Sequence, residues 1–229
     1  TLAMAVMREA AISAFKPEPF YTVQIGLDGF TAASERFKTK AAAEAVKQSC
    51  SVAIVQKAEC KEKTEKPPAL YDLTSLQREA NRVLGYTAQQ TLDYTQNLYE
   101  KKLVTYPRTD ARVLSTAAAK EIYKNISGLR NYEHTAEIAQ HIIEQGNYKN
   151  LAKTRYVNDK QITDHYAIVP TGQGLNTLRS VSLTAQRVYE TIVRRFVCIF
   201  YPPAVYQKIS LVTKIQNESF FSSFKVLLD

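Results

Sequence analysis

Hydrophobic and polar positions change their spacing along the chain, from alternation to a helical period and back to alternation. Residues 1–15 precede the first alternating part, and their apolar side chains recur at helical spacing until Lys16-Pro-Glu-Pro, which predicts the end of a helix. From Phe20 apolar and polar residues alternate, and Asp28-Gly29 interrupts them with a turn signal. This part of the chain therefore predicts a two-stranded hairpin.

The first β part continues to about residue 62 with one helical insertion. Residues 39–48 are rich in alanine, and Thr39 can cap the N-terminus of a helix there. Residues 51–60 have the spacing of another strand. The charged residues 61–68, which end in two prolines, predict a linker.

After the linker the spacing becomes helical. Thr74 with Gln77, and Thr87 with Gln90, have the spacing of capping boxes at two helix starts. Gly85 lies between them and is typical of a helix end. The sequence therefore predicts two consecutive helices before residue 103.

Three further helices are predicted before the proline pair at the end of the helical part. One is capped by Ser115 or Thr116 and ends at Gly128. Residues 135–144 and about 184–201 carry apolar side chains at helical spacing and predict the other two. After this helical part alternation returns and lasts to the end of the chain, with one turn signal.

The order β, α, β predicts an α+β fold, in which a mainly α-helical domain is inserted between two halves of one antiparallel β domain. Residues 1–15 are assigned to the end of a preceding helical domain. Residues 16–62 and 203–229 are assigned to a discontinuous β domain, and residues 67–202 to the helical domain.

Composition adds a preference for an anionic partner. The 229 residues include 30 Lys+Arg against 22 Asp+Glu, which gives a net charge of +8 and an isoelectric point near 9.3. No apolar run approaches the roughly 20 residues that span a membrane, and no membrane partner is expected. Cys50, Cys60 and Cys198 lie too far apart for a disulfide framework or a zinc motif, which suits a reducing cytoplasm.

The candidate chemistry lies in residues 103–115, which read LVTYPRTDARVLS. The proline after Tyr106 biases that tyrosine toward an extended backbone, and in an extended segment Tyr106 and Arg108 share a face. A phenol with a pKa of about 10 is a poor nucleophile by itself. A guanidinium beside it can neutralise the oxygens of a phosphodiester, so the pair is suited to forming a covalent link to DNA.

Two strings carry a family resemblance. YPRTD followed by an arginine, at residues 106–112, resembles the active-site segment of the type IA DNA topoisomerases and is most similar to the bacterial topoisomerase III group. ITDHYAIVPTG, at residues 162–172, resembles the His-x-Ala-Ile-x-Pro-Thr motif of that family. Residues 67–103 and 183–203 are similar to it as well.

The resemblance implies a fold and an activity. In this family a helical domain that carries the tyrosine is inserted into a β domain that acts as a hinged arch around a hole, and the two are domains II and III of the enzyme. The enzymes cleave and religate single-stranded DNA through a 5′-phosphotyrosyl intermediate, pass a strand through the break, and need no ATP.

The resemblance also implies residue roles. Tyr106 is the expected nucleophile, Arg108 is expected to hold the scissile phosphate, and His165 to contact that phosphate or to assist its positioning. Further DNA contacts are expected from Gln96 and Glu100, which are four residues apart and share a helical face, and from Lys102, Thr109 and Arg112. Thr109 can equally brace its loop, because short polar side chains readily bond nearby backbone.

No metal ligand is expected in this chain. The family uses Mg²⁺ held by a Toprim domain with a D-x-D pair, and the sequence contains no D-x-D. The chain begins inside an apparent helix and ends directly after an apparent strand, so we expect a fragment that is inactive without the Toprim domain. The expected partners are single-stranded DNA and the remaining domains of a monomeric protein of the bacterial cytoplasm.

Two other readings stay open. A relaxase would need a cluster of histidines, whereas the three histidines here are dispersed, and a tyrosine recombinase would carry its tyrosine near the end of its catalytic domain. A non-catalytic module that binds single-stranded DNA would use tyrosine and arginine for stacking and phosphate pairing without forming an adduct.

Overall fold

A computed structural model describes residues 2–49 and 52–228 of the chain; the predicted start of a strand at residue 51, Cys50 and both terminal residues lie outside the described residues. The chain divides into two compact units. One consists of residues 1–65 and 204–229, and the other of residues 66–203. The units are called the sheet unit and the helical unit below.

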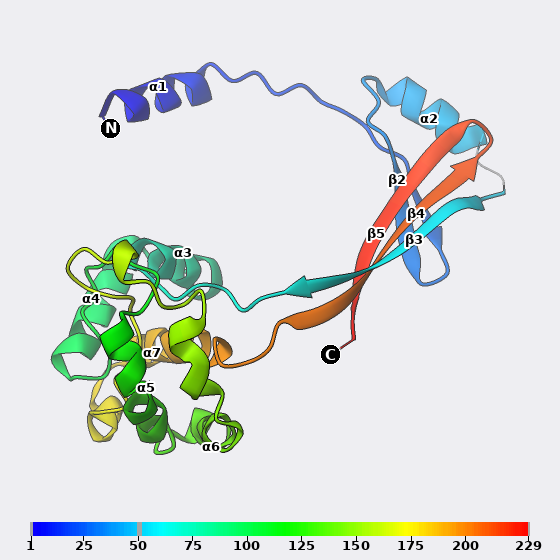
Figure 1. The fold of residues 1–229 in the computed structure, drawn as a ribbon. Coiled ribbons are helices and arrows are strands. Elements are labelled where there is room, and N and C mark those ends of the chain that lie inside the picture. Colours follow the sequence, from blue (N-terminus) through cyan, green and yellow to red (C-terminus); the bar gives the residue numbers. More distant parts are fainter. Residues whose placement is uncertain (1, 50–51, 229) are drawn as a thin grey trace. The chain divides into compact units, whose positions relative to one another are not determined.

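The sheet unit contains one five-stranded antiparallel sheet, with strands in the order β1-β2-β5-β4-β3 (Figure 1). Its strands are β1 (Gln24–Leu27), β2 (Phe30–Ser34), β3 (Ile54–Glu65), β4 (Ala204–Ile215) and β5 (Glu218–Leu227). Strands from before and after the helical unit thus pair in a single sheet. This arrangement confirms the predicted α+β fold with a helical insertion.

The predicted hairpin is present between β1 and β2. Leu27 pairs with Phe30, and Gly29 between them has a φ of +80°, a conformation that glycine adopts without steric cost. The predicted helix after the hairpin is α2 (Lys40–Ser49), and the Thr39 hydroxyl accepts a hydrogen bond from the Ala42 amide at 3.3 Å. Both local signals were therefore read correctly.

The predicted linker over residues 61–68 is wrong in its first half. β3 continues to Glu65, which pairs with Ala204 of β4. Lysines and glutamates neighbour each other along this exposed strand, and Glu59 lies 2.7 Å from Lys57 and 3.1 Å from Lys61. Hydrogen bonds from these two lysines, Lys57 first, lower the pKa of Glu59 to about 2. Because the charges compensate one another in solvent, they do not interrupt the strand.

The core of the sheet unit is small. Its buried residues are Val23, Ala32, Ala43, Ile215 and Phe220. The helix α1 (Leu2–Ser13) adds no buried residue to it. Backbone pairing along the long strands therefore carries much of the order in this unit.

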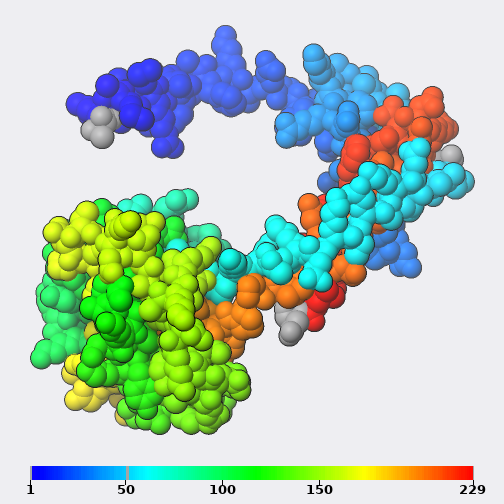
Figure 2. Space-filling model, viewed as in Figure 1, coloured from blue at the N-terminus to red at the C-terminus, as the bar shows by residue number. Residues whose placement is uncertain are grey.

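The helical unit contains five α-helices and four short 3₁₀ helices among the described residues. The α-helices are α3 (Leu73–Leu84), α4 (Ala88–Glu100), α5 (Thr116–Leu129), α6 (Ala136–Gln145) and α7 (Leu183–Cys198). The 3₁₀ helices are η1 (Glu133–Thr135), η2 (Asn147–Lys153), η3 (Asp159–Gln161) and η4 (Leu175–Ser180). Figure 2 shows these elements as a closely packed body of green to yellow atoms.

Helix starts in this unit follow most of the predicted caps. Thr87 caps α4 in a capping box with Gln90, Ser115 caps α5, and Gly85 ends α3 in the left-handed conformation. The cap predicted at Thr74 is wrong, because α3 begins two residues earlier with Asp72 as its N-cap. A carboxylate is as good a cap as a hydroxyl, so the sequence pattern fitted both.

The predicted stop at Gly128 is also wrong, since α5 continues to Leu129. Gly128 does not end the helix; it lets a loop pack closely against α5. A Cβ at this position would lie 2.0 Å from the carbonyl oxygen of Gly172, so only glycine lets the loop before η4 lie against the helix.

Candidate active site around Tyr106

The two sequence motifs lie side by side in the helical unit. The Thr105 amide donates to the Val169 carbonyl at 3.0 Å, and the Thr171 amide donates to the Leu103 carbonyl at 3.0 Å. Val104 and Pro170 form an antiparallel bridge between these hydrogen bonds. The tyrosine segment and the histidine segment therefore form one short ribbon, although about 60 residues separate them.

Two threonine hydroxyls fasten the tyrosine segment to the histidine segment on either side of Tyr-Pro-Arg. The Thr105 hydroxyl donates to the Ala167 carbonyl and accepts from the Val169 amide, both at 2.9 Å. The Thr109 hydroxyl donates to the His165 carbonyl at 2.8 Å and accepts from the Ala111 amide at 3.1 Å. Each hydroxyl uses its proton and a lone pair inside the protein, so both act as braces.

Burial alternates along the residues that follow Tyr106. The side chains at 107, 109, 111 and 113 are buried, whereas Arg108, Asp110 and Arg112 are exposed. Tyr106 itself is partly buried. This alternation is that of an extended chain and places Arg108 on the same side as Tyr106, as expected from the proline.

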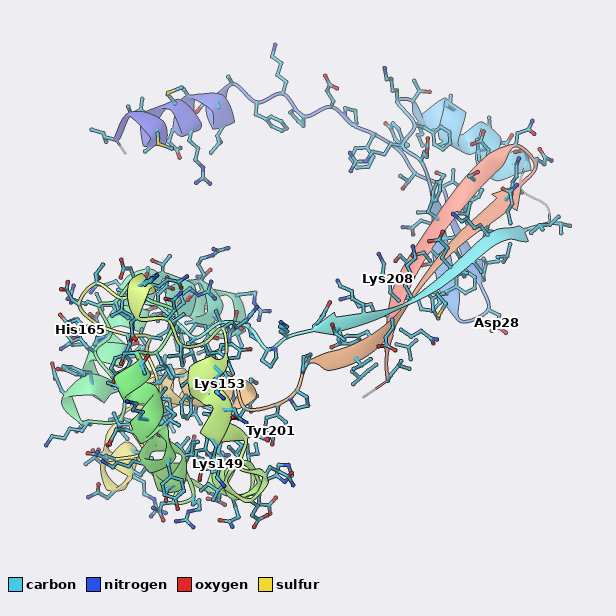
Figure 3. All side chains as sticks on the ribbon, viewed as in Figure 1. Asp28, Lys149, Lys153, His165, Tyr201 and Lys208 are labelled. Carbon is cyan, nitrogen blue, oxygen red and sulfur yellow. The ribbon has the colours of Figure 1, made fainter. Side chains whose placement is uncertain are left out.

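The Tyr106 ring lies between two other rings. Its centroid is 4.3 Å from that of His165 and 5.4 Å from that of Tyr99, and the Tyr99 contact is edge-to-face. Tyr99 comes from the last turn of α4, and His165, labelled in Figure 3, is exposed at the surface of the helical unit. Both neighbours restrict the tyrosine ring without covering it.

A cavity of about 520 Å³ opens beside these rings. Its lining combines aromatic, hydroxyl, carboxylate and ammonium groups. The lining residues are Tyr99, Glu100, Lys102, Val104, Thr105, Tyr106, His165, Tyr166, Thr171 and Gln173. The cavity has room for a nucleotide-sized group, and the tyrosine lies in its wall.

Lys102 adopts an unusual backbone conformation at the edge of this cavity, with a φ of +62°. It is the left-handed residue that ends α4, because the amide of Leu103 donates back to the carbonyl of Leu98 at 2.9 Å. Glycine normally occupies such a position, and a lysine there costs on the order of 1 kcal/mol. The turn directs the chain from α4 into the tyrosine segment.

The predicted DNA contacts do not all lie in this cavity. Glu100 and Lys102 line it, whereas Gln96 lies beyond Glu100 and donates to its carboxylate at 3.1 Å. Arg108 is exposed outside the lining, and no hydrogen bond or ion pair holds its side chain within the described ranges. Its guanidinium is free to turn toward a ligand.

Arg112 lies in a different place. Its Nε donates to the Leu70 carbonyl at 3.1 Å, and its side chain lines a second cavity. Arg112 lies on the same side of the extended segment as Tyr106 and Arg108. It is six residues after Tyr106, however, and an extended chain of that length carries it away from the tyrosine.

Sequence reasoning missed several residues of the cavity. Tyr99 was one of 14 tyrosines without a distinguishing context, and Gln173 follows the histidine motif. Tyr166 and Thr171 lie inside that motif, but no role was assigned to them. Burial raises the pKa of Tyr166, so that phenol is neutral at ordinary pH. Tyr99 had one usable signal, because it follows Gln96 by three residues on a helix that leads to Tyr106.

In residues 2–49 and 52–228, no group of three or more His, Cys, Asp and Glu side chains comes together in a way that could hold a metal ion. Over the same residues, none of the helices has the length and apolar character that crossing a membrane requires.

Comparison with known proteins places the chain in a family. A family model described as DNA topoisomerase matches residues 1–229. The chain therefore belongs to the bacterial DNA topoisomerase family, the type IA class that its two motifs resemble.

Within this family the chain is similar to DNA topoisomerase 3 of several bacilli. It is 34% identical to that of Bacillus subtilis strain 168, over 99% of this chain and 32% of the relative. It is 35% identical to that of Shouchella clausii, over 95% of this chain and 31% of the relative. The chain thus spans about a third of the length of these relatives.

A solved structure supports the fold. Full-length topoisomerase I from Thermotoga maritima matches with a TM-score of 0.69 at 22% identity, over 99% of this chain and 37% of that chain. At this identity the match bears on the fold alone.

Proposed function

We propose that this chain is the part of a type IA DNA topoisomerase that carries the DNA-cleaving tyrosine, and that the whole protein changes DNA topology by passing one strand through a transient break in another. The observation that carries the proposal is the position of Tyr106. Its ring lies in the wall of an open cavity, 4.3 Å from the His165 ring, in a segment fastened to the histidine motif.

The proposed reaction is an attack by Tyr106 on a backbone phosphate of single-stranded DNA. The phenol oxygen bonds to phosphorus and gives up its proton, while the bond from phosphorus to the 3′ oxygen breaks and that oxygen takes up a proton. The products are a 5′-phosphotyrosine and a free 3′-hydroxyl. Religation reverses these steps, so the energy of the broken bond is kept and no ATP is needed.

The side chains around Tyr106 support distinct roles in this reaction. Arg108, free and on the side of Tyr106, is suited to neutralising the scissile phosphate. The His165 imidazole lies against the attacking ring and can donate a hydrogen bond to the same phosphate. Glu100 and Lys102 line the cavity where the neighbouring nucleotide would lie, and Gln96 orients Glu100.

Magnesium belongs to the proposal as a cofactor of the whole protein. The described residues do not supply a set of ligands for it, so we place its carboxylates in a Toprim domain outside this chain. When bound there it would neutralise charge on the reacting phosphate. We propose accordingly that residues 1–229 alone form little or no adduct, and that the protein acts as a monomer in the bacterial cytoplasm.

Trapping of the covalent intermediate tests the proposal. The full-length protein that contains this chain is mixed with labelled single-stranded DNA and Mg²⁺ and quenched with denaturant. We expect a labelled protein band with the unaltered protein and none with Tyr106→Phe, because phenylalanine keeps the ring packing but has no oxygen.

A tyrosine elsewhere in the helical unit provides the matched control. Tyr123 is 43% exposed and lies outside the cavity, so Tyr123→Phe is expected to leave the adduct unchanged. An adduct that persists in Tyr106→Phe would refute the assignment of the nucleophile. DNA binding without any adduct in the unaltered protein would favour the non-catalytic binding module.

A further inference from the structure

A second set of cavities in the helical unit is lined by arginines. One cavity of about 400 Å³ and another of about 280 Å³ share Tyr71, Glu79 and Arg195, so they adjoin. Neither shares a residue with the cavity at Tyr106. We call the pair the arginine groove, after its arginines Arg78, Arg82, Arg112, Arg187, Arg194 and Arg195.

The groove concentrates positive charge. Its lining holds six arginines, no lysine and two glutamates, Glu79 and Glu190, which leaves a surplus of four positive charges. The whole chain has a surplus of eight. Half of the net charge of the protein is thus collected on the faces of two helices, α3 and α7, and the segment after Tyr106. Such a field attracts polyanions.

The two carboxylates are already paired. Glu79 lies 2.8 Å from Arg82, one turn along α3, and Glu190 lies 2.6 Å from Arg194, one turn along α7. The other four arginines form no ion pair with any residue that the structure describes. Their charges are therefore available to a ligand.

Two of these four guanidiniums are held in place by the protein. Arg195 lies over the Tyr71 ring, 4.2 Å from its centroid, and donates from Nη1 to the Ala69 carbonyl at 3.1 Å. Arg112 donates from Nε to the Leu70 carbonyl, so both of its terminal nitrogens stay free. A guanidinium that is already oriented loses less side-chain entropy when it binds an anion.

We propose that the arginine groove binds the phosphodiester backbone of a DNA strand, at a site separate from the one at Tyr106. Arginine binds phosphate oxygens bidentately, and a row of arginines on two helices fits a repeating anion better than a single phosphate. The identity of the polymer as DNA rests on the proposed function. The site itself rests on the charges and contacts given above.

The test measures binding of labelled single-stranded DNA to the 229-residue chain as a function of salt. The variant is Arg78→Gln with Arg187→Gln, both exposed and neither engaged in an ion pair or a side-chain hydrogen bond in the described structure. Each lost phosphate contact lowers the slope of log K against log salt by about 0.7, so the slope should fall by about 1.4. At 0.1 M salt this corresponds to binding about 25-fold weaker.

The matched control removes the same charge elsewhere. Lys120→Gln with Lys149→Gln changes two exposed cations that lie outside the groove. It is expected to change the slope by less than half as much. Equal effects of the two double variants, or no measurable DNA binding by the chain at low salt, would overturn the proposal.

A second measurement needs no substitution in the groove. Arginines are modified with phenylglyoxal with and without DNA, and the modified positions are located by mass spectrometry. We expect DNA to protect Arg78, Arg112 and Arg187, whereas Arg155, outside the groove, stays reactive. Unprotected groove arginines in the presence of bound DNA would refute the site.

Both measurements are made in the Tyr106→Phe background, which keeps them independent of the cleavage reaction. If the groove substitutions weaken DNA binding while the parent protein still forms a normal adduct, the assignment of Tyr106 as the nucleophile stands and the second site is supported. Normal groove binding without any adduct in the parent protein would support the groove and refute the assignment of Tyr106 as the nucleophile.

Discussion

The helical unit and the sheet unit are each stabilised internally in a different way. Among the residues that the structure describes, the hydrophobic core of the helical unit has 29 buried members and that of the sheet unit has five. The sheet unit instead has long backbone ladders, with β4 paired to β3 and β5 along nearly its whole length. One unit is specified mainly by side-chain packing and the other mainly by backbone pairing.

This difference explains where chemistry can be placed. Tyr106 follows the buried residues Leu103 and Val104, and His165 precedes the buried run Ala167–Pro170, so the core fixes the backbone on which both residues of the candidate site stand. A site of this kind needs fixed geometry within fractions of an ångström. The exposed strands of the sheet unit give no such support, and a change there should affect stability more than catalysis.

The largest predicted effect is in the small core. Phe220 is fully buried at its centre, and Phe220→Ala should cost about 3–5 kcal/mol, enough to unfold much of the sheet unit. Phe196→Ala should cost a similar amount in the helical unit, whose larger core retains more of its contacts. Thermal unfolding followed by calorimetry should show two transitions, each lowered by one variant. A single transition lowered equally by both would refute the separation.

The next effect in size concerns the packing of α5 on the loop after the histidine motif. A Cβ in Gly128→Ala would meet the backbone of Gly172, which cannot move as a flexible side chain can. We expect a loss of about 1–3 kcal/mol and a displaced histidine segment. The urea concentration at the midpoint of unfolding and the yield of covalent adduct should both fall.

The sheet unit provides the control for this prediction. A Cβ at Gly26 would meet nothing within 4 Å, so Gly26→Ala should leave the adduct unchanged. If Gly128→Ala were tolerated like Gly26→Ala, the close approach would not determine the position of the loop.

The same two units show what a sequence can reveal. Asp28-Gly29 and the Thr87–Gln90 capping box were read correctly because a turn or a cap depends on three or four consecutive residues. The insertion of a helical part into a sheet followed from the return of a period of two near residue 205. Local turn and cap signals, together with the order of strand and helix patterns, were therefore enough to predict the fold class.

The errors arose where distant residues decide the outcome. Gly128 is a glycine because of Gly172, 44 residues later, and the charged residues after 60 stay in a strand because β4 pairs with them. In the candidate site, the motifs predicted Tyr106, Arg108 and His165 as a set, but only the fold shows that Tyr99 lies against Tyr106 and that Arg112 belongs to another groove. Patterns of neighbouring residues do not predict contacts between residues that are far apart in the sequence.

A smaller effect is expected at the brace between the two motifs. Thr105→Val keeps the shape of the side chain but leaves the Ala167 carbonyl and the Val169 amide without their hydroxyl partner, at a cost of about 1–2 kcal/mol. Because the brace positions Tyr106, the rate of adduct formation should fall more than DNA affinity does. Single-turnover cleavage and equilibrium binding measure the two.

Thr105→Ser restores the hydroxyl and should recover most of the cleavage rate. A Thr105→Val protein that cleaves as fast as the Thr105→Ser protein would show that the ribbon is held without this brace.

The smallest predicted effect is the pH dependence of the α5 N-terminus. The Asp159 carboxylate accepts hydrogen bonds from the Thr116 hydroxyl at 2.6 Å and the Thr116 amide at 2.8 Å, and these bonds lower the pKa of Asp159, the hydroxyl contributing most. A carboxyl with a lowered pKa in the folded state stabilises it above the unfolded pKa, and the contribution is lost as the pH falls through the folded pKa. Asp159→Asn should therefore melt slightly below the unaltered protein at pH 7, and the difference should shrink and vanish as the pH falls through the lowered pKa of the folded state. Asp164→Asn, also exposed in the helical unit, serves as the control. If Asp159→Asn still melts below the unaltered protein at low pH, the start of α5 depends on the shape of the side chain and not on its charge.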